Sequence, residues 1–79
     1  MIEVRLPQFG MGMRDAMILK WLYSPGDTVK EGEPLVEIEA AKATVEVVAP
    51  ASGVLTTILV KENEVVQVRD LIAIISAGE

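Results

Sequence analysis

The stretch EIEAAKATVEV, residues 37–47, combines two opposing structural signals. Its centre, residues 39–43, consists of glutamate, alanine and lysine, which are among the strongest helix formers. Its flanks alternate between branched apolar and polar side chains, which is the period of a half-buried strand. We therefore expect a hairpin whose two strands are joined by Ala41 and Lys42. The symmetric pairing places Val36 opposite Val47, Glu37 opposite Glu46 and Ile38 opposite Val45.

The expected hairpin has an unusual tip. The connection Ala41-Lys42 lacks the Asn-Gly or glycine that primed hairpin turns favour, so we expect a type I turn, which most residues tolerate. The flanking alanines keep bulk away from Lys42 and leave its amine reachable. A lysine at a hairpin tip is most often a solvated loop residue. However, Glu37 opposite Glu46 is an unfavourable like-charge pair, which indicates that hairpin stability alone does not shape this surface.

Short apolar runs separated by turns continue on both sides of the hairpin. The runs cover residues 2–6, 16–24, 28–29, 35–39, 44–48, 54–60, 65–66 and 71–76. Proline and glycine mark the turns at residues 24–27 and 50–53, where they supply a fixed or a positive φ. No segment has a 3.6-residue apolar stripe over three turns. The pattern predicts an all-β sandwich or barrel.

The two halves of the chain resemble each other. Residues 26–41 align with 63–77 after deletion of one residue, residues 16–24 with 53–61, and residues 4–7 with 47–50. The matched pairs include Val29 with Val66, Leu35 with Leu71 and Ile38 with Ile74. We predict two similar four-strand halves that pack on one core about a pseudo-twofold axis, because each half alone buries too little apolar surface. The first half has the longer loop, at residues 8–15. The alignment also places the lysine hairpin at the opposite end from Ser76 and the N-terminal strand.

Composition excludes several classes of function. The 79 residues predict one domain, residues 1–79, and with 51% hydrophobic but only 4% aromatic residues its core is aliphatic. The chain has no cysteine and no histidine, which excludes a disulfide, a thiolate nucleophile and the commonest general base and metal ligand. A net charge of −5 with scattered Lys and Arg argues against nucleic acid as a partner. Without a membrane-length apolar run or a signal-peptide pattern, we expect a cytoplasmic protein with no membrane partner.

Glu39-Ala40-Ala41-Lys42-Ala43, with TVEVVAPASGVL behind it at residues 44–55, resembles the lipoyl domain of 2-oxo acid dehydrogenase acyltransferases. That family has Glu-Thr-Asp-Lys-Ala at this place, and its lysine is lipoylated. The resemblance covers nearly the whole chain. It includes the first loop, LPQFGMGM, and the approach to the lysine, ILKWLYSPGDTVKEGEPLVEIE. Gly32 and Gly53 lie about where the family has glycines.

The resemblance implies a fold, a cofactor and partners. The fold would be a flattened barrel-sandwich hybrid of two four-stranded sheets. Lipoic acid would be attached covalently to Lys42 as N6-lipoyllysine, and the hairpin residues Glu39, Ala40, Ala41 and Ala43 would be recognised by other proteins. The domain would be a non-catalytic carrier, monomeric in isolation, in a 2-oxo acid or acetoin dehydrogenase complex. Its implied partners are a lipoate ligase or lipoyl transferase, a thiamine-dependent decarboxylase, an acyltransferase catalytic domain and dihydrolipoamide dehydrogenase.

Two alternatives stay open because the hairpin departs from the family pattern. Ala40 replaces the family's Thr or Ser, and Ala41 replaces its Asp. Glu-Ala-Ala-Lys-Ala is also compatible with the Ala-Met-Lys-Met motif of biotin carriers, with both methionines shortened. The long first loop and the lack of a Pro-Met-Pro-Gly-type start favour the lipoyl reading. The alternatives are a biotin carrier of a carboxylase and an unmodified β-sandwich adaptor. We expect either an excised piece of a longer acyltransferase or a truncated copy.

Several other residues have structural interpretations. We expect Trp21 to pack in or beside the core. Three methionines, Met11, Met13 and Met17, should provide adaptable packing beneath the first loop. Gly10 and Gly12 should permit the backbone of that loop, which lies near the lysine tip in the resembled family. The acidic residues Glu37, Glu39 and Glu46 are expected to form a solvated face.

Overall fold

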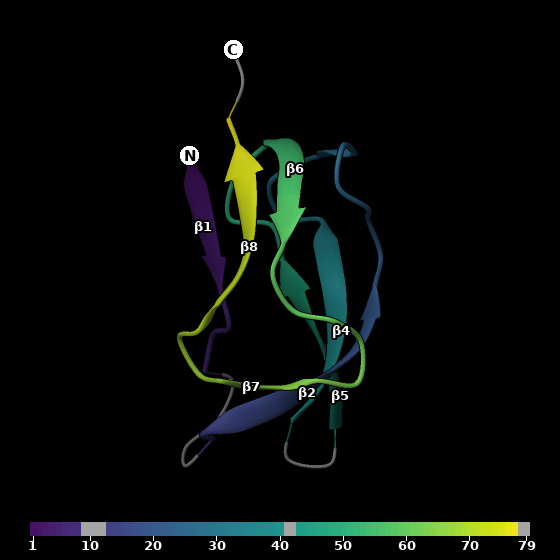
Figure 1. The fold of residues 1–79 in the computed structure, drawn as a ribbon, viewed down its shortest axis with the longest axis vertical. Coiled ribbons are helices and arrows are strands. Elements are labelled where there is room, and N and C mark those ends of the chain that lie inside the picture. The colour runs from purple at the N-terminus through teal and green to yellow at the C-terminus, as the bar shows by residue number, and fades with distance from the viewer. Residues whose placement is uncertain (9–12, 41–42, 78–79) are drawn as a thin grey trace.

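Every regular element of the chain that the structure describes is a β-strand. The computed structural model describes residues 1–8, 13–40 and 43–77. The strands are β1 (Ile2–Arg5), β2 (Asp15–Trp21), β3 (Thr28–Val29), β4 (Pro34–Ala40), β5 (Ala43–Val48), β6 (Gly53–Ile58), β7 (Val65–Gln67) and β8 (Leu71–Ser76). They form two four-stranded antiparallel sheets (Figure 1). Sheet A has the order β1-β8-β6-β3 and sheet B the order β5-β4-β2-β7. The predicted all-β fold of two four-stranded sheets is confirmed.

The two sheets are related by exchange of the two halves of the chain. Each strand of the first half corresponds to one of the second half: β1 to β5, β2 to β6, β3 to β7 and β4 to β8. Exchanging the members of each pair converts the strand order of sheet A into that of sheet B. Each sheet therefore contains two strands from each half, so neither half is a complete sheet. The irregularities follow the same exchange, because the register shifts between Ile18 and Lys20 in β2 and between Leu55 and Thr57 in β6. The predicted pseudo-twofold symmetry is confirmed.

The symmetry is a constant offset of 37 residues from β2–β4 to β6–β8. Leu35 and Ile72 are both 0% exposed. Each carbonyl accepts an equivalent backbone hydrogen bond, from the N–H of Leu22 to Leu35 at 2.8 Å and from the N–H of Leu59 to Ile72 at 2.9 Å. Leu35 therefore corresponds to Ile72, without any deletion between the halves.

The predicted deletion was wrong by one residue. It matched Leu35 with Leu71 and Ile38 with Ile74, but Leu71 and Ile74 are only half-buried. The buried counterpart of Ile38 is Ile75, and both are 0% exposed. Because side chains alternate between the two faces of a strand, a shift of one residue exchanges the core face for the solvent face.

Two turns in each half contain a residue with positive φ. Gly26 (φ 99°) corresponds to Asn63 (φ 72°), and Gly32 (φ 89°) corresponds to Arg69 (φ 76°). Glycine adopts this conformation without a steric penalty, and asparagine adopts it more readily than most residues. Arg69 is therefore the most strained of the four.

Replacing Arg69 with glycine is expected to stabilise the domain by about 0.5 kcal/mol. A positive φ costs an ordinary L-residue about 1–2 kcal/mol, and the larger entropy that glycine loses on folding offsets roughly 0.5–1 kcal/mol of that gain. The Arg69 carbonyl, which accepts a hydrogen bond from the Arg5 guanidinium at 2.9 Å, is retained. Urea unfolding measures the change. Lys30→Gly is the control, because the φ of Lys30 itself is not positive, and it should destabilise the domain. Equal losses of stability in the two variants would contradict the strain at Arg69.

The core between the sheets is aliphatic, as expected. Its buried residues are Val4, Leu6, Ala16, Ile18, Val29, Leu35, Val36, Ile38, Ala40, Val47, Ala49, Leu55, Val66, Ile72, Ala73 and Ile75. Trp21 and Met13 are partly buried and pack against this core. The Trp21 indole N–H donates a hydrogen bond to the carbonyl of Val60 at 3.1 Å. The predicted packing role of Trp21 is confirmed. Of the three methionines predicted to provide packing, Met13 packs against the core, Met17 is half-buried in β2, and Met11 lies outside the described residues.

A side-chain hydrogen bond closes the turn before β4. The Tyr23 hydroxyl donates to the Glu33 carboxylate at 2.9 Å, and that carboxylate also accepts the N–H of Lys30 at 3.1 Å. This hydrogen bond raises the pKa of Tyr23 above its ordinary value, and burial and the negative charges of Glu33 and Asp27 act in the same direction. The contact supports the turn at the end of the molecule where β4 begins.

The hairpin strands β4 and β5 meet at the opposite end from the chain termini. Ile2 pairs with Ile75, so β1 begins beside the end of β8. In Figure 1 these two segments lie at the top, whereas β4 ends and β5 begins at the bottom. The molecule is 38 Å long, and the predicted placement of the hairpin is confirmed. Over the described ranges, no helix has the length and apolar character needed to cross a membrane.

Candidate functional site

The β4–β5 hairpin has the register that the sequence predicts. Val36 pairs with Val47, Glu37 with Glu46 and Ile38 with Val45. Pairing continues through Glu39 and Thr44 to Ala40 and Ala43. Ala41 and Lys42 are therefore the two residues that join the paired strands. Both lie outside the described residues, as does the expected type I turn, so the site is built here from the strands that lead to it.

Burial alternates along the two strands. Ala40 is 6% exposed and belongs to the core, together with Ile38 and Val36. Glu39 and Thr44 are exposed on the outer face of sheet B, and Ala43 is exposed at the start of β5. Of the described hairpin residues, Glu39 and Ala43 are thus accessible to another protein, whereas the Ala40 methyl group packs inside.

The like-charge pair on the hairpin has a basic neighbour. Glu37 pairs with Glu46 on one side and with Lys20 of β2 on the other. Lys20 therefore offsets part of the repulsion between the two carboxylates. Lys20 could not be predicted from the hairpin sequence alone, because only the β2–β4 register places it beside Glu37. Glu39 and Glu46 are exposed and Glu37 is half-buried, which agrees with the predicted solvated face.

The first loop leads into β2 beside the hairpin. Met17 of β2 pairs with Glu39, so β2 begins next to the end of β4 (Figure 1). Asp15, the first residue of β2, pairs with Gln67 of β7. Residues 9–12, with Gly10, Met11 and Gly12, lie outside the described residues. The loop thus ends at the site, as the resemblance implied.

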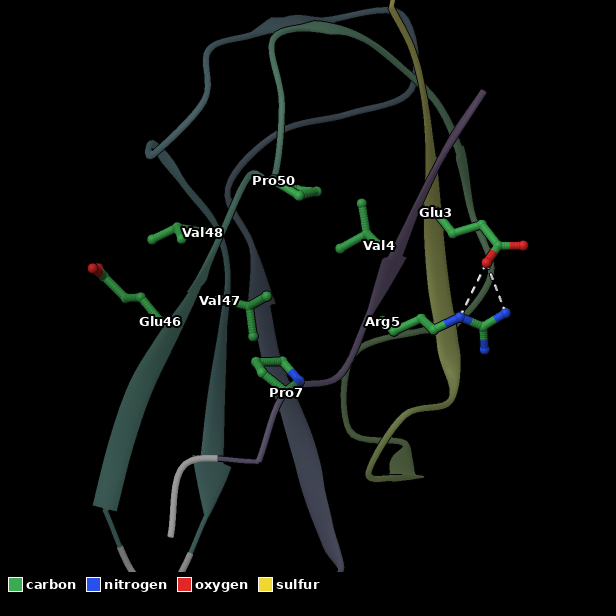
Figure 2. A pocket seen from close by; sticks show the side chains of 8 residues that line it. All are labelled: Glu3, Val4, Arg5, Pro7, Glu46, Val47, Val48 and Pro50. Carbon is green, nitrogen blue, oxygen red and sulfur yellow. Dashed lines mark hydrogen bonds and ion pairs between the residues drawn. The ribbon is translucent and has the colours of Figure 1, made fainter.

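A crevice of about 390 Å³ lies between the edge strands β1 and β5 (Figure 2). It is lined by Glu3, Val4, Arg5, Pro7, Glu46, Val47, Val48 and Pro50. Figure 2 shows the Glu3–Arg5 ion pair, 2.8 Å long, and the Glu46 carboxylate pointing away from its centre. The crevice therefore offers an apolar wall instead of converging polar groups. Over the described ranges, no group of three or more His, Cys, Asp or Glu side chains could hold a metal ion.

Comparison with known proteins identifies the family. A family model for biotin and lipoyl attachment domains, described as "Biotin-requiring enzyme", matches residues 2–75. A solved structure, the lipoyl domain of the 2-oxoglutarate dehydrogenase complex from Azotobacter vinelandii, superposes with a TM-score of 0.80 at 32% identity, over 100% of both chains. The chain belongs to the biotin/lipoyl family and is a lipoyl domain.

Curated relatives of this lipoyl domain are components of 2-oxo acid dehydrogenase complexes. The dihydrolipoyllysine-residue succinyltransferase component of the 2-oxoglutarate dehydrogenase complex of Bacillus subtilis is 40% identical over 78 residues, which are 99% of this chain and 19% of the relative. The acetyltransferase component of the pyruvate dehydrogenase complex of Staphylococcus aureus is 39% identical over 77 residues, 98% of this chain and 18% of the relative. The chain spans about a fifth of the length of these relatives.

The comparisons agree with the family that the hairpin sequence indicates. Lipoyl domains carry lipoic acid bound covalently to a lysine. The comparisons do not favour a biotin carrier or an unmodified adaptor, since the solved relative is a lipoyl domain and the curated relatives are dihydrolipoyllysine-residue acyltransferases. The flattened two-sheet fold implied by the resemblance is confirmed.

Proposed function

We propose that Lys42 is the residue of this lipoyl domain to which lipoic acid is attached. The observation that supports it is the β4–β5 register, which pairs Ala40 with Ala43 and leaves Ala41 and Lys42 to join two strands at one end of the molecule. The other lysines occupy different settings. Lys20 lies within β2, and Lys30 and Lys61 lie in turns that follow β3 and β6.

The hairpin suits covalent attachment of a long cofactor. Lysine ends in a primary amine on a flexible four-carbon stem, and this amine forms an amide once it is deprotonated. Because the unperturbed pKa of a lysine side chain is about 10.4, the modifying enzyme must remove the proton. When bound, lipoic acid supplies a strained disulfide for acyl-group and electron transfer. The chain itself contributes a tether point, and tethering raises the local concentration of the carried group at each active site.

The proposed role is that of a non-catalytic carrier within a 2-oxo acid dehydrogenase complex, with residues 1–79 as one domain. The relatives named above belong to such complexes. The carrier would be loaded by a lipoate ligase or lipoyl transferase. It would then serve a thiamine-dependent decarboxylase, an acyltransferase catalytic domain and dihydrolipoamide dehydrogenase in turn. Glu39 and Ala43 are exposed for contact with these partners, whereas Ala40 contributes by packing the end of β4 into the core.

Intact-mass measurement after enzymatic modification tests this function. The purified domain is incubated with lipoate ligase, lipoate and ATP, and separately with biotin ligase, biotin and ATP. We expect one lipoyl adduct per chain and no biotin adduct. A biotin adduct would indicate a carboxylase carrier, and the lack of any adduct with both enzymes would indicate an unmodified adaptor.

Restoring the family's aspartate at position 41 is expected to change the choice of decarboxylase but not lipoylation. Ala41 lies outside the described residues, so the prediction rests on its chemistry: aspartate adds a charged carboxylate, and with it a polar contact, beside Lys42, and we expect the substitution to leave the turn geometry almost unchanged. Reductive acylation rates of lipoylated Ala41→Asp and wild-type domains are compared across several decarboxylases, with an expected change of about fivefold for at least one of them. Equal rates with every decarboxylase would contradict a role for position 41 in partner choice.

A further inference from the structure

One outward-facing row of side chains crosses all four strands of sheet B beside the hairpin end. Val65 of β7 pairs with Met17 of β2, Met17 pairs with Glu39 of β4, and Glu39 pairs with Thr44 of β5. Val65 is 61% exposed. Glu39 and Thr44 are exposed, and Met17 is half-buried. We call these four residues the tip row. It places an apolar pair, Met17 and Val65, next to a carboxylate.

Acidic side chains lie on the same face of sheet B as the apolar pair. Asp15 precedes Met17 by two residues on β2, so both lie on the same face of the strand. The next outward row contains Lys20, Glu37 and Glu46. Among the described residues of these rows of sheet B, four side chains are acidic (Asp15, Glu37, Glu39 and Glu46) and one is basic (Lys20). A complementary surface would have an apolar side chain at its centre and lysine or arginine around it.

The pseudo-symmetry shows that the fold does not require the tip row. The counterparts of Val65, Met17 and Glu39 are Thr28, Val54 and Ser76, which pair in the same manner in sheet A. These three counterparts have neither a charge nor a long apolar side chain. The counterpart of the fourth member, Thr44, is Met1, which is 90% exposed and precedes β1. The two rows occupy equivalent backbone positions, so the difference between them reflects something other than folding.

Three of the four acidic residues near the tip row have uncharged counterparts in the other half of the chain. The counterparts of Asp15, Glu37 and Glu39 are Ser52, Ile74 and Ser76. The counterpart of Glu46 is Glu3, whose carboxylate forms an ion pair with Arg5 at 2.8 Å. The negative charge is thus concentrated on the face of sheet B, next to the strands that hold Lys42.

We propose that the tip row is the docking surface for the enzyme that attaches lipoate to Lys42, an inference that rests on the proposed function. Before attachment the domain has no cofactor, so this enzyme can recognise only the polypeptide. The neighbours of Lys42 in sequence are alanines, which offer no more than methyl groups. Along the described strands of the hairpin, the first outward pair beyond Ala40 and Ala43 is Glu39 and Thr44, which belongs to the tip row. The enzyme places an apolar side chain over Met17 and Val65 and a basic side chain against Glu39.

A symmetry exchange tests the proposal. The variant Met17→Val/Glu39→Ser/Val65→Thr gives the tip row the side chains of its counterpart. The reciprocal variant Thr28→Val/Val54→Met/Ser76→Glu builds a tip row at the other end and is the matched control. Initial rates of lipoylation are measured by intact mass at several domain concentrations. We expect kcat/KM to fall about tenfold or more for the first variant, mainly through KM, and to stay at the wild-type value for the control.

Two further measurements separate docking from loss of structure. Val65→Thr alone changes a mostly exposed side chain and should lower kcat/KM about threefold with an unchanged unfolding midpoint. Val48→Thr, at a site that is 51% exposed on β5, is its control and should have no effect. The wild-type rate should also fall with added salt more steeply than that of the exchanged variant, because salt screens exposed charges.

The outcomes distinguish this inference from the function on which it rests. Wild-type rates for the exchanged variant would overturn the docking surface while Lys42 remains the attachment site. Equal losses in the exchanged and reciprocal variants would also overturn it, because the effect would then not belong to sheet B. A wild-type domain that receives no lipoyl group would overturn the proposed function and the docking surface together.

Discussion

Replacing Lys42 with arginine is expected to abolish lipoylation completely. Arginine keeps the positive charge and the length of the side chain, but its guanidinium does not lose a proton in proteins and cannot act as the amine nucleophile. The domain should therefore show no adduct after incubation with lipoate ligase, and no reductive acylation by a decarboxylase. Stability should change by no more than about 0.5 kcal/mol, because the change preserves charge at a position between two paired strands.

The remaining lysines provide matched controls. Lys20→Arg, Lys30→Arg and Lys61→Arg should each keep the full adduct, since none of them joins the hairpin strands. Intact mass compares all four variants under the same conditions. A lipoyl adduct that persists in Lys42→Arg and disappears in one of the controls would contradict attachment at Lys42.

Replacing Gly53 with alanine is expected to destabilise the domain by about 3 kcal/mol. An added Cβ would clash with the backbone carbonyl oxygen of Ser76 and lie 2.9 Å from the Cγ2 atom of Ile75. Both neighbours belong to β8, which pairs with β6 at this point and with β1 on its other side. The obstructing atom is part of a hydrogen-bonded backbone, so relief requires a shift of the sheet. In a domain of this size, a loss of about 3 kcal/mol is a large part of the total stability.

Thermal unfolding measures this loss, which corresponds to a decrease of roughly 15 °C in the unfolding midpoint. Gly26→Ala is the control, because its Cβ would meet nothing within 4 Å and only the positive φ of 99° is unfavourable. That conformation costs about 1–2 kcal/mol. If the two variants were equally destabilised, the close approach at Gly53 would not be the reason for glycine there.

The hairpin could be predicted from the sequence because its signal is local. Apolar and polar residues alternate on both sides of Ala41 and Lys42, and only one register places Ile38 opposite Val45 with both facing the core. The structure has that register. The repeat of the two halves could also be predicted from the sequence, where Val29 aligns with Val66. Both residues are buried at equivalent positions in the structure.

The one-residue error in the alignment has a physical cause. Leu35 was matched with Leu71 because the two residues are identical. In the structure, equivalent positions lie on the same face of a strand, and the buried counterpart of Leu35 is Ile72. The positive φ of Arg69, opposite Gly32 in the symmetry, would have revealed the correct offset, but an arginine gives no sign of that conformation.

The neighbours of the hairpin on sheet B could not be predicted from local sequence. Lys20 beside Glu37, and Val65 beside Met17, come together through pairing between segments that are far apart in the chain. Met17 was expected only to pack beneath the first loop, and its position in an outward row depends on the β2–β4 register. Such cross-strand rows depend on which strands are neighbours in the sheet. The same short strands could be arranged in several orders, and each order would give different rows.

We expect this lipoyl domain to carry its cofactor on Lys42. Tandem mass spectrometry of peptides from the protein isolated from its own cells locates the modified lysine. We expect the lipoyl group on the peptide that contains Lys42, with Lys20, Lys30 and Lys61 unmodified in the same digest. Biotin on Lys42, a lipoyl group on another lysine, or a fully unmodified Lys42 in cells that make lipoic acid would contradict the account.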